Sequence, residues 1–256
     1  MEKAYKDLFA GEMTLSYNSK QQSENGKEQT EEHNNFLKQV PIFSELDDNT
    51  LDQIAKAGSK KSFSKDSVVL LENEPGSALF VIISGKVKVS RVSNDGKEVI
   101  LTILNDSDFF GEMAILDGLS RSANIIAMKD SELFIIRGNE FIDLLYNNPK
   151  ISTALLTVLV QRLRSADMKI KSLSIKDAEG RVASAILQLA DDTGKIKHGA
   201  VEIEKLPLQY DLANMAGTSR ETISRTLHSF SKKGFVELQG SKLRILDYEK
   251  FKELFN

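Results

Sequence analysis

A polar segment near the C-terminal end of the chain, GTSRETISRTLHSF at residues 217–230, carries side chains suited to reading the edges of nucleic-acid bases. If the segment is helical, successive side chains turn by about 100° and its apolar residues form one buried face. These are Ile223, Leu227 and Phe230. Glu221 and Arg225 then point outward, and Arg220 lies at the N-terminal end of the helix. Because Arg can donate two hydrogen bonds to guanine and Glu can accept one from cytosine, this exposed row suits a DNA major groove.

Hydroxyl groups at the start of the same helix suit contacts with phosphate. Ser219 and Thr222 lie beside the backbone N–H groups of the first turn, which attract anions. Two other interpretations stay open from the residues alone. Glu221 can pair with Thr218 in a capping box, and Arg225 can be an ordinary solvated charge.

The segments on either side favour the DNA interpretation. QYDLANMA, at residues 209–216, reads as a helix and is followed by a turn at Gly217, so the two helices predict a helix-turn-helix. Beyond Gly234, the strand-like runs FVEL and LRIL flank a turn and predict a hairpin wing.

A second segment, FFGEMAILDGLSRSANIIA at residues 109–127, has residue types that suit a phosphorylated sugar. Gly111 lets backbone amides approach a phosphate, and Arg121 can bind the same anion through two hydrogen bonds. Ser122 can donate to a phosphate oxygen, and Glu112 can accept from a ribose hydroxyl. The alternative is an Arg-Ser turn and an acidic loop that bind no ligand.

The chain around this second segment predicts a β-domain. Between residues 63 and 141 the apolar runs are short and rich in Val, Ile and Phe, and turn signals such as Asn94-Asp95-Gly96 separate them. Short strands with turns about every ten residues indicate an antiparallel jelly roll.

A helical repeat follows the β-domain. Its apolar residues are spaced 3, 4, 3, 4 and 3 apart, and they are Leu156, Leu159, Leu163, Ala166, Ile170 and Leu173. Such a narrow heptad seam needs a partner helix, and a second copy of the chain would give a two-fold homodimer. Packing of the seam against the chain's own barrel is the alternative.

Composition excludes several classes of function. The chain has no cysteine, which excludes thiolate-bound iron–sulfur clusters and zinc, and its three histidines lie far apart and outside the barrel, so we expect neither a metal nor haem. It lacks a signal peptide and an apolar run of the roughly 18 residues that span a bilayer, so we expect a cytoplasmic protein with no membrane partner. No catalytic constellation stands out, and we expect that the protein is not an enzyme.

These patterns together predict an α+β chain of 256 residues in four parts. Residues 1–35 are too poor in apolar side chains to fold and predict a flexible polar tail. Residues 36–148 predict the jelly-roll sensory domain, and residues 149–176 predict the dimerisation helix. Residues 177–256 predict a winged helix-turn-helix domain that binds DNA. The net charge of the whole chain is −3, but from Lys205 onward nine Lys/Arg face six Asp/Glu.

Two motifs carry a family resemblance. DLANMAGTSRETISRTL resembles the recognition motif of the family of the cyclic-AMP receptor protein and the fumarate–nitrate reduction regulator, here called the CRP/FNR family. The resemblance extends over residues 36–250. It implies that Arg220, Glu221 and Arg225 contact the bases of a palindromic operator with TGTGA-like half-sites. Ser224 matches the family's E-x-x-S-R pattern, and RNA polymerase is implied as a downstream partner.

The segment FFGEMAILDGLSRSANIIA resembles the phosphate-binding cassette of cyclic-nucleotide domains. This resemblance implies a bound cyclic nucleotide that controls DNA affinity, and it gives the binding roles to Gly111, Glu112, Arg121 and Ser122. Cyclic AMP is favoured over cyclic GMP by its frequency in the family. A non-nucleotide effector, or DNA binding without any ligand, remains the alternative function.

One departure from the family concerns the base of the nucleotide. Ala166 and Asp167 stand where the cyclic-AMP receptor has a Thr-Ser pair that contacts adenine. In one interpretation Asp167 forms a salt bridge with Arg162 of the partner helix, as residues at heptad positions e and g do. In the other, the carboxylate of Asp167 accepts hydrogen bonds from guanine or from the adenine amino group.

Overall fold

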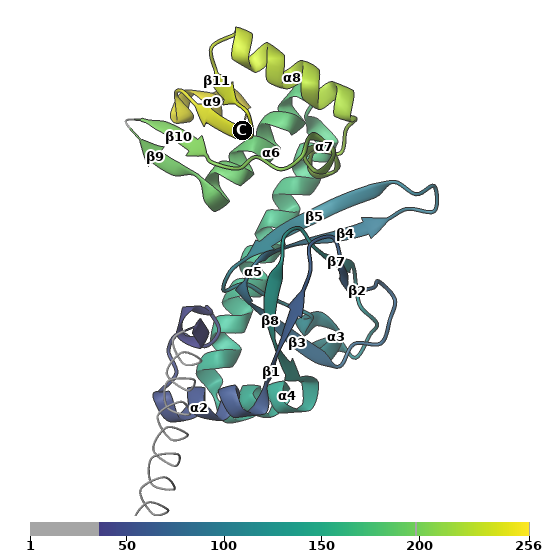
Figure 1. Cartoon of the computed structure of the whole chain (residues 1–256), viewed down its shortest axis with the longest axis vertical. Coiled ribbons are helices and arrows are strands. Elements are labelled where there is room, and N and C mark those ends of the chain that lie inside the picture. Colours follow the sequence, from purple (N-terminus) through teal and green to yellow (C-terminus); the bar gives the residue numbers. More distant parts are fainter. Residues whose placement is uncertain (1–35, 198, 256) are drawn as a thin grey trace, which may run out of the picture.

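The computed structural model describes residues 36–197 and 199–255, and the predicted tail at residues 1–35 lies outside this part of the chain. A β-barrel is followed by the long helix α5, Pro149–Ile175, which runs along the barrel and leads into a C-terminal winged domain (Figure 1). The α+β fold class predicted from the sequence is confirmed.

Antiparallel strands form the barrel as two four-stranded sheets, with the orders β1-β8-β3-β6 and β2-β7-β4-β5. The strands are β1 Ser59–Phe63, β2 Val68–Leu70, β3 Ala78–Ser84, β4 Lys86–Val92, β5 Glu98–Asn105, β6 Phe109–Phe110, β7 Asn124–Ala127 and β8 Ser131–Arg137. Alternate residues of these strands face one another between the sheets, where Phe80, Ile82, Leu104 and Leu133 are buried. The predicted jelly roll therefore has its own apolar core.

The hairpin of β4 and β5 is made by the turn that the sequence predicted. Gly96 has a φ of 80°, which a residue without Cβ adopts at little cost, and its N–H donates to the carbonyl of Ser93 at 2.9 Å. The paired strands run from Lys86 opposite Asn105 to Val92 opposite Glu98. The hairpin extends beyond the barrel toward the winged domain (Figure 1).

Helices α2 and α4 lie at the end of the barrel away from the winged domain (Figure 1), and the short helix α3 connects β6 to β7. Their bounds are Asp48–Ala57 for α2, Glu112–Asp117 for α3 and Gly138–Asn147 for α4. Asp47 begins α2 by accepting a hydrogen bond from the N–H of Thr50 at 2.9 Å. The buried rings of Phe43, Phe134 and Phe141 belong to the apolar cluster that joins these helices and α5 to the sheet.

Helix α5 leaves an apolar stripe exposed, and that stripe differs from the predicted seam. Leu156, Leu163 and Ile170 are exposed as a dimer seam would be, and Val160 extends them. Leu159, however, packs against the barrel cluster. Leu173 is also exposed, and it lies near the turn after α7, where a Cβ on Gly217 would be 2.9 Å from its Cδ2 atom. Leu159 therefore serves a contact within the chain, because the same helix must also cover the barrel. In the described residues, no helix is both long and apolar enough to cross a membrane.

The winged domain consists of helices and a small antiparallel sheet. The helices are α6 Ala178–Thr193, α7 Gln209–Ala216, α8 Arg220–Lys232 and α9 Tyr248–Phe255. The sheet has the order β11-β12-β10-β9, with β9 Lys195–Lys197, β10 Ala200–Ile203, β11 Val236–Gln239 and β12 Lys242–Ile245. The wing of β11 and β12 and the turn at Gly217, with φ 58°, are as predicted. Helix α9, which packs Phe251 against Phe230, was not predicted.

The backbone before α3 gives a stability prediction. Gly111 has a φ of 89°, and a Cβ there would lie 2.8 Å from both the carbonyl oxygen of Ala78 and Nη1 of Arg121. Gly96 has a similar φ of 80° with nothing within 4 Å, so Gly96→Ala is the matched control for backbone strain alone. We expect Gly111→Ala to lower the free energy of unfolding by about 1–2 kcal/mol more than Gly96→Ala, measured by urea denaturation. Equal losses in the two variants would contradict the close contact.

Candidate functional site

The floor of the predicted cassette is built around one buried guanidinium. Arg121 is 6% exposed, and its Nη1 and Nη2 donate to the carbonyl oxygens of Gly111 at 2.8 Å and Ala78 at 3.0 Å. The group also lies over the ring of Phe80. Its Nε is buried and has no hydrogen-bond partner among the described residues. Burial lowers the pKa of Arg121, so an anion placed here would relieve a desolvated cation.

An ion pair joins the cassette to the long helix. Glu112, 3% exposed at the start of α3, binds Nη1 of Arg162 at 2.8 Å through its Oε1 atom. Nη2 of Arg162 donates to the carbonyl oxygen of Phe109 at 2.6 Å, and the guanidinium lies over the Phe109 ring. Two elements 50 residues apart are thus fixed to one another at the carboxylate that the sequence assigned to a ribose.

This pair changes one sequence interpretation. A salt bridge between Arg162 and Asp167 of a partner helix was one of the two predicted roles of Asp167. Arg162 instead turns toward the barrel and binds Glu112 of its own chain, because a buried carboxylate needs a cation close by. Asp167 is exposed on α5. Ser122 is also exposed, and its hydroxyl lies 3.5 Å from the sulfur of Met113.

Lys169, two helical turns beyond Arg162, makes a further contact that the sequence reasoning missed. Its Nζ donates to the carbonyl oxygens of Ile100 at 2.6 Å and Leu101 at 3.3 Å on β5. Burial lowers the pKa of Lys169. The signal in the sequence was two cations seven residues apart on the side of α5 that faces the barrel.

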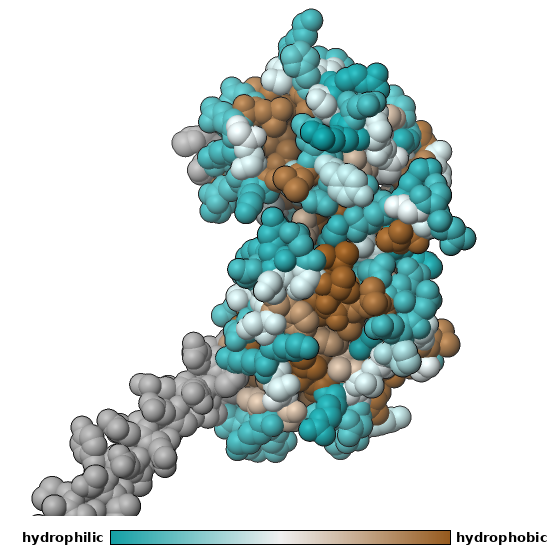
Figure 2. Space-filling view, turned by 45° about the vertical axis from the view of Figure 1, so that its right-hand side comes forward, coloured by the Kyte–Doolittle hydropathy of each residue, from teal (hydrophilic) through white to brown (hydrophobic). Residues whose placement is uncertain are grey.

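The second predicted site, on α8, has the geometry that the helical periodicity indicated. Its apolar side is buried, and it consists of Ile223, Leu227 and Phe230 together with Thr226. Its exposed side consists of Arg220, Glu221, Ser224, Arg225 and His228. The helix lies at the outer end of the winged domain, away from the barrel (Figure 1), and this end of the molecule is largely hydrophilic (Figure 2). One helix face therefore presents every side chain that was predicted to contact bases.

The cap of α8 settles the alternative offered for Glu221. Ser219 is the N-cap and accepts a hydrogen bond from the N–H of Thr222 at 3.2 Å, so a capping box that begins at Thr218 is not formed. Glu221 keeps its carboxylate exposed. The hydroxyl of Thr222 lies 3.0 Å from that of Ser219 and accepts from Nη2 of Arg225 at 3.4 Å. Both hydroxyls predicted to contact phosphate thus also organise the first turn.

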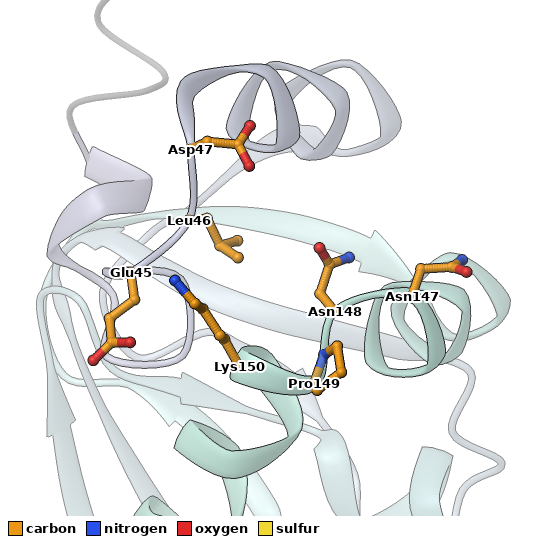
Figure 3. Close-up of a pocket in the computed structure, with 7 residues that line it drawn as sticks. All are labelled: Glu45, Leu46, Asp47, Asn147, Asn148, Pro149 and Lys150. Atoms are coloured by element: carbon orange, nitrogen blue, oxygen red, sulfur yellow. The ribbon is translucent and has the colours of Figure 1, made fainter.

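An open groove of about 460 Å³ lies apart from both sites, between the start of α2 and the junction of α4 and α5 (Figure 3). Its polar side chains serve the ends of helices: Asp47 caps α2, and the amide of Asn148 donates to the carbonyl of Leu144 at 3.1 Å. Within the described ranges, no group of three or more His, Asp or Glu side chains has the arrangement of a metal site.

Comparisons with known proteins match both halves of this architecture. Residues 60–148 match the model of the cyclic nucleotide-binding domain, and residues 180–254 match that of the Crp-like helix-turn-helix domain. The chain is 33% identical over 215 residues to the CRP-like cAMP-activated global transcriptional regulator of Mycobacterium tuberculosis, covering 84% of this chain and 96% of the relative. It is 32% identical to the cyclic AMP receptor protein of Thermus thermophilus, covering 79% of this chain and 90% of the relative.

A solved structure gives the same relationship in three dimensions. A mutant of CooA from Carboxydothermus hydrogenoformans superposes with a TM-score of 0.69 at 28% identity, over 78% of this chain and 89% of that one. The two matched family models fall on the barrel with its cassette and on the winged helix-turn-helix, on either side of the long helix. With this order of domains and this degree of identity, the chain belongs to the CRP/FNR family of DNA-binding transcription regulators.

Proposed function

We propose that this protein is a homodimeric, sequence-specific regulator whose affinity for DNA is controlled by a cyclic nucleotide bound in the jelly roll. The observation that carries this proposal is the guanidinium of Arg121. It is buried, it retains a free Nε donor among the described residues, and it lies against the left-handed backbone of Gly111. A desolvated cation beside the start of α3, where no side chain caps the helix, favours an anionic ligand such as a cyclic phosphate.

The nucleotide would use the cassette residues for its phosphate and its sugar. Gly111, Arg121 and Ser122 would hold the phosphate, and Glu112 would accept from the ribose hydroxyl. Since Glu112 already binds Arg162 of α5, a ligand at this carboxylate changes the contact that fixes the long helix. A ligand shifts a conformational equilibrium only through such a difference in contacts between the two states.

We assign the recognition of the base to Asp167 on α5. Its predicted ionic partner, Arg162, is bound to Glu112, and Asp167 lies exposed within the apolar stripe of the helix. A carboxylate can accept from two adjacent donors of guanine or from the amino group of adenine. The names of the relatives from Mycobacterium and Thermus support cyclic AMP as the ligand, and cyclic GMP is the rival.

The exposed stripe of α5 supports the homodimer. Leu156, Val160, Leu163 and Ile170 are spaced 4, 3 and 7 residues apart, as positions a and d of a coiled coil are. A two-fold axis along this stripe would pair the α5 helices of two chains. The two α8 helices would then be able to enter successive major grooves about 34 Å apart.

In that dimer, α8 would read each half of a palindromic operator. Arg220, Glu221 and Arg225 would contact base edges of a TGTGA-like half-site, with Ser224 beside them. Ser219 and Thr222, with the first backbone N–H groups of α8, would contact phosphate. RNA polymerase is the downstream partner that the family resemblance implies.

One observation favours a second candidate, DNA binding that needs no ligand. The cassette is satisfied in large part by its own chain, because Arg121 donates to two carbonyl oxygens and Glu112 is paired with Arg162. A family member with such a closed cassette can keep the barrel as a scaffold or answer a different effector. Direct titration separates the two candidates.

Replacement of Arg121 tests the nucleotide site. We expect the purified wild type to bind cyclic AMP in calorimetric titrations and Arg121→Ala to bind it about ten- to a hundredfold more weakly, because a charge-assisted hydrogen bond is lost. Arg137→Ala, an exposed arginine at the start of α4, is the control and should bind normally. Parallel titration with cyclic GMP identifies the base. Operator binding by a wild type that gives no heat with either nucleotide would favour the ligand-independent candidate.

Replacement of Arg225 tests base reading. We expect Arg225→Ala to lose about 1–3 kcal/mol of binding free energy for the intact operator and to tolerate substitution of one guanine in each half-site. Affinities are measured by fluorescence anisotropy on a set of operators with single base changes. Arg91→Ala, an exposed barrel residue, serves as the control. A uniform loss over every sequence would point to a phosphate contact instead.

A further inference from the structure

The barrel and the winged domain share an apolar core. Ile100 and Ile103 of β5 are buried in the same cluster as Leu212 of α7 and Ile223 and Leu227 of α8. Helix α7 packs directly on β5, and the β4–β5 hairpin reaches it from below in the view of Figure 1. The sensory hairpin therefore forms part of the support of the helix-turn-helix.

A partly buried group of charged and polar side chains lies in the same contact, and we call it the interdomain cluster. It consists of Lys88 on β4, Glu98 on β5, and Asp211 and Asn214 on α7. Nζ of Lys88 lies 2.8 Å from Oε2 of Glu98 and 3.7 Å from Oδ1 of Asp211. The amide of Asn214 donates to the same Glu98 oxygen at 3.1 Å. The side chains of Lys88, Glu98 and Asp211 are only 15, 10 and 13% exposed.

Lys88 supplies the positive charge that attracts both carboxylates of this cluster. It places one cation between a carboxylate of the barrel and a carboxylate of α7. The side chain of Asp211 is largely removed from solvent, and this burial raises the pKa of its carboxyl. Removal of the cation would leave Glu98 and Asp211 as two buried carboxylates on opposite sides of the contact, an arrangement that drives the surfaces apart.

The contacts that fix the position of α7 also constrain the position of α8. The two helices are joined by the short turn at Gly217, where the N–H of Thr218 donates to the carbonyl of Ala213 at 3.0 Å. On its other side β5 is held by Lys169 of α5, whose Nζ donates to the carbonyls of Ile100 and Leu101. The hairpin is thus fixed to both the long helix and the helix-turn-helix.

We propose that Lys88 and Glu98 are positioning residues for DNA recognition, which set the orientation of α8 through α7 and so determine the half-site spacing that the dimer accepts. Neither residue lies on α8. The inference rests on the proposed function, because spacing is a property of a dimer that reads two half-sites. Two recognition helices match DNA only when their separation and direction fit its helical repeat, so a loosened α7 should relax the preference for spacing.

The first experiment measures orientation without DNA. Since the chain has no cysteine, Tyr146→Cys on α4 and His228→Cys on α8 provide two exposed positions for spin labels. Labelled chains are mixed with an excess of unlabelled chain, so that each dimer carries one labelled pair, and distances are measured by double electron–electron resonance. We expect a narrow distribution with Lys88 present and a broad one in Lys88→Met. Lys195→Met, at an exposed ion pair with Glu204, is the control and should stay narrow. Lys88→Met with Asp211→Asn should recover part of the narrow distribution, because one of the two carboxylates is removed.

The second experiment measures spacing. Operators with TGTGA half-sites that differ only in the number of base pairs between them, and a DNA with a single half-site, are titrated with each variant. We expect the preference of Lys88→Met for the best spacing to fall by roughly tenfold, while its affinity for a single half-site stays unchanged.

Three results would overturn the inference. They are an unchanged distance distribution in Lys88→Met, an unchanged spacing preference, or an equal loss on every DNA including the single half-site. A wild type that binds none of the operators would instead contradict the proposed function, and the distance measurement would still decide whether Lys88 orients α8.

Discussion

The placement of α5 against the barrel is the constraint on which the other features depend. Arg162 binds Glu112 and the carbonyl of Phe109, and Lys169 binds two carbonyls of β5. A buried carboxylate and the carbonyls at a sheet edge both need partners, and two cations on one side of the helix supply them. Because these contacts are two turns apart on the same side, they fix the rotation of the helix as well as its position along the barrel.

The exposed stripe follows from that rotation. With Arg162 and Lys169 directed at the barrel, Leu159 is drawn toward the same side, while Leu156, Leu163 and Ile170 are left on a side that the described chain does not cover. The nucleotide site that we propose and the dimer contact that we propose thus both involve the helix α5. Glu112 contacts α5 directly through Arg162, so a ligand at the proposed site would meet the same helix that carries the stripe.

Local signals were sufficient for much of the fold, and they failed where distant segments meet. The turn at Gly96, the left-handed Gly217 and the buried face of Ile223 were readable because their causes lie within a few residues. The pairs of Glu112 with Arg162 and of Lys88 with Asp211 join segments far apart in the chain, so no periodicity announces them. In the sequence, these charged residues are indistinguishable from solvent-exposed ones. They pair only because the fold brings them together. The same reason explains why helical spacing predicted a seam but gave no sign that Leu159 also packs against the barrel.

The closed state of the cassette bears on how a ligand would act. Arg121 and Glu112 already have partners within the chain, so a nucleotide gains only the difference between its own contacts and those it replaces. At the phosphate end of the proposed site, Nε of Arg121 has no partner among the described residues, but Nη1 and Nη2 would have to share or leave the carbonyls of Gly111 and Ala78. At the sugar end of the proposed site, a ligand on Glu112 would have to share or displace Arg162, which is a residue of α5. At the base end of the proposed site, Asp167 would offer a carboxylate, and Ala166 beside it has no polar side chain. In the site that we propose, the exchange at Arg162 is therefore one contact through which a bound ligand would act on the long helix.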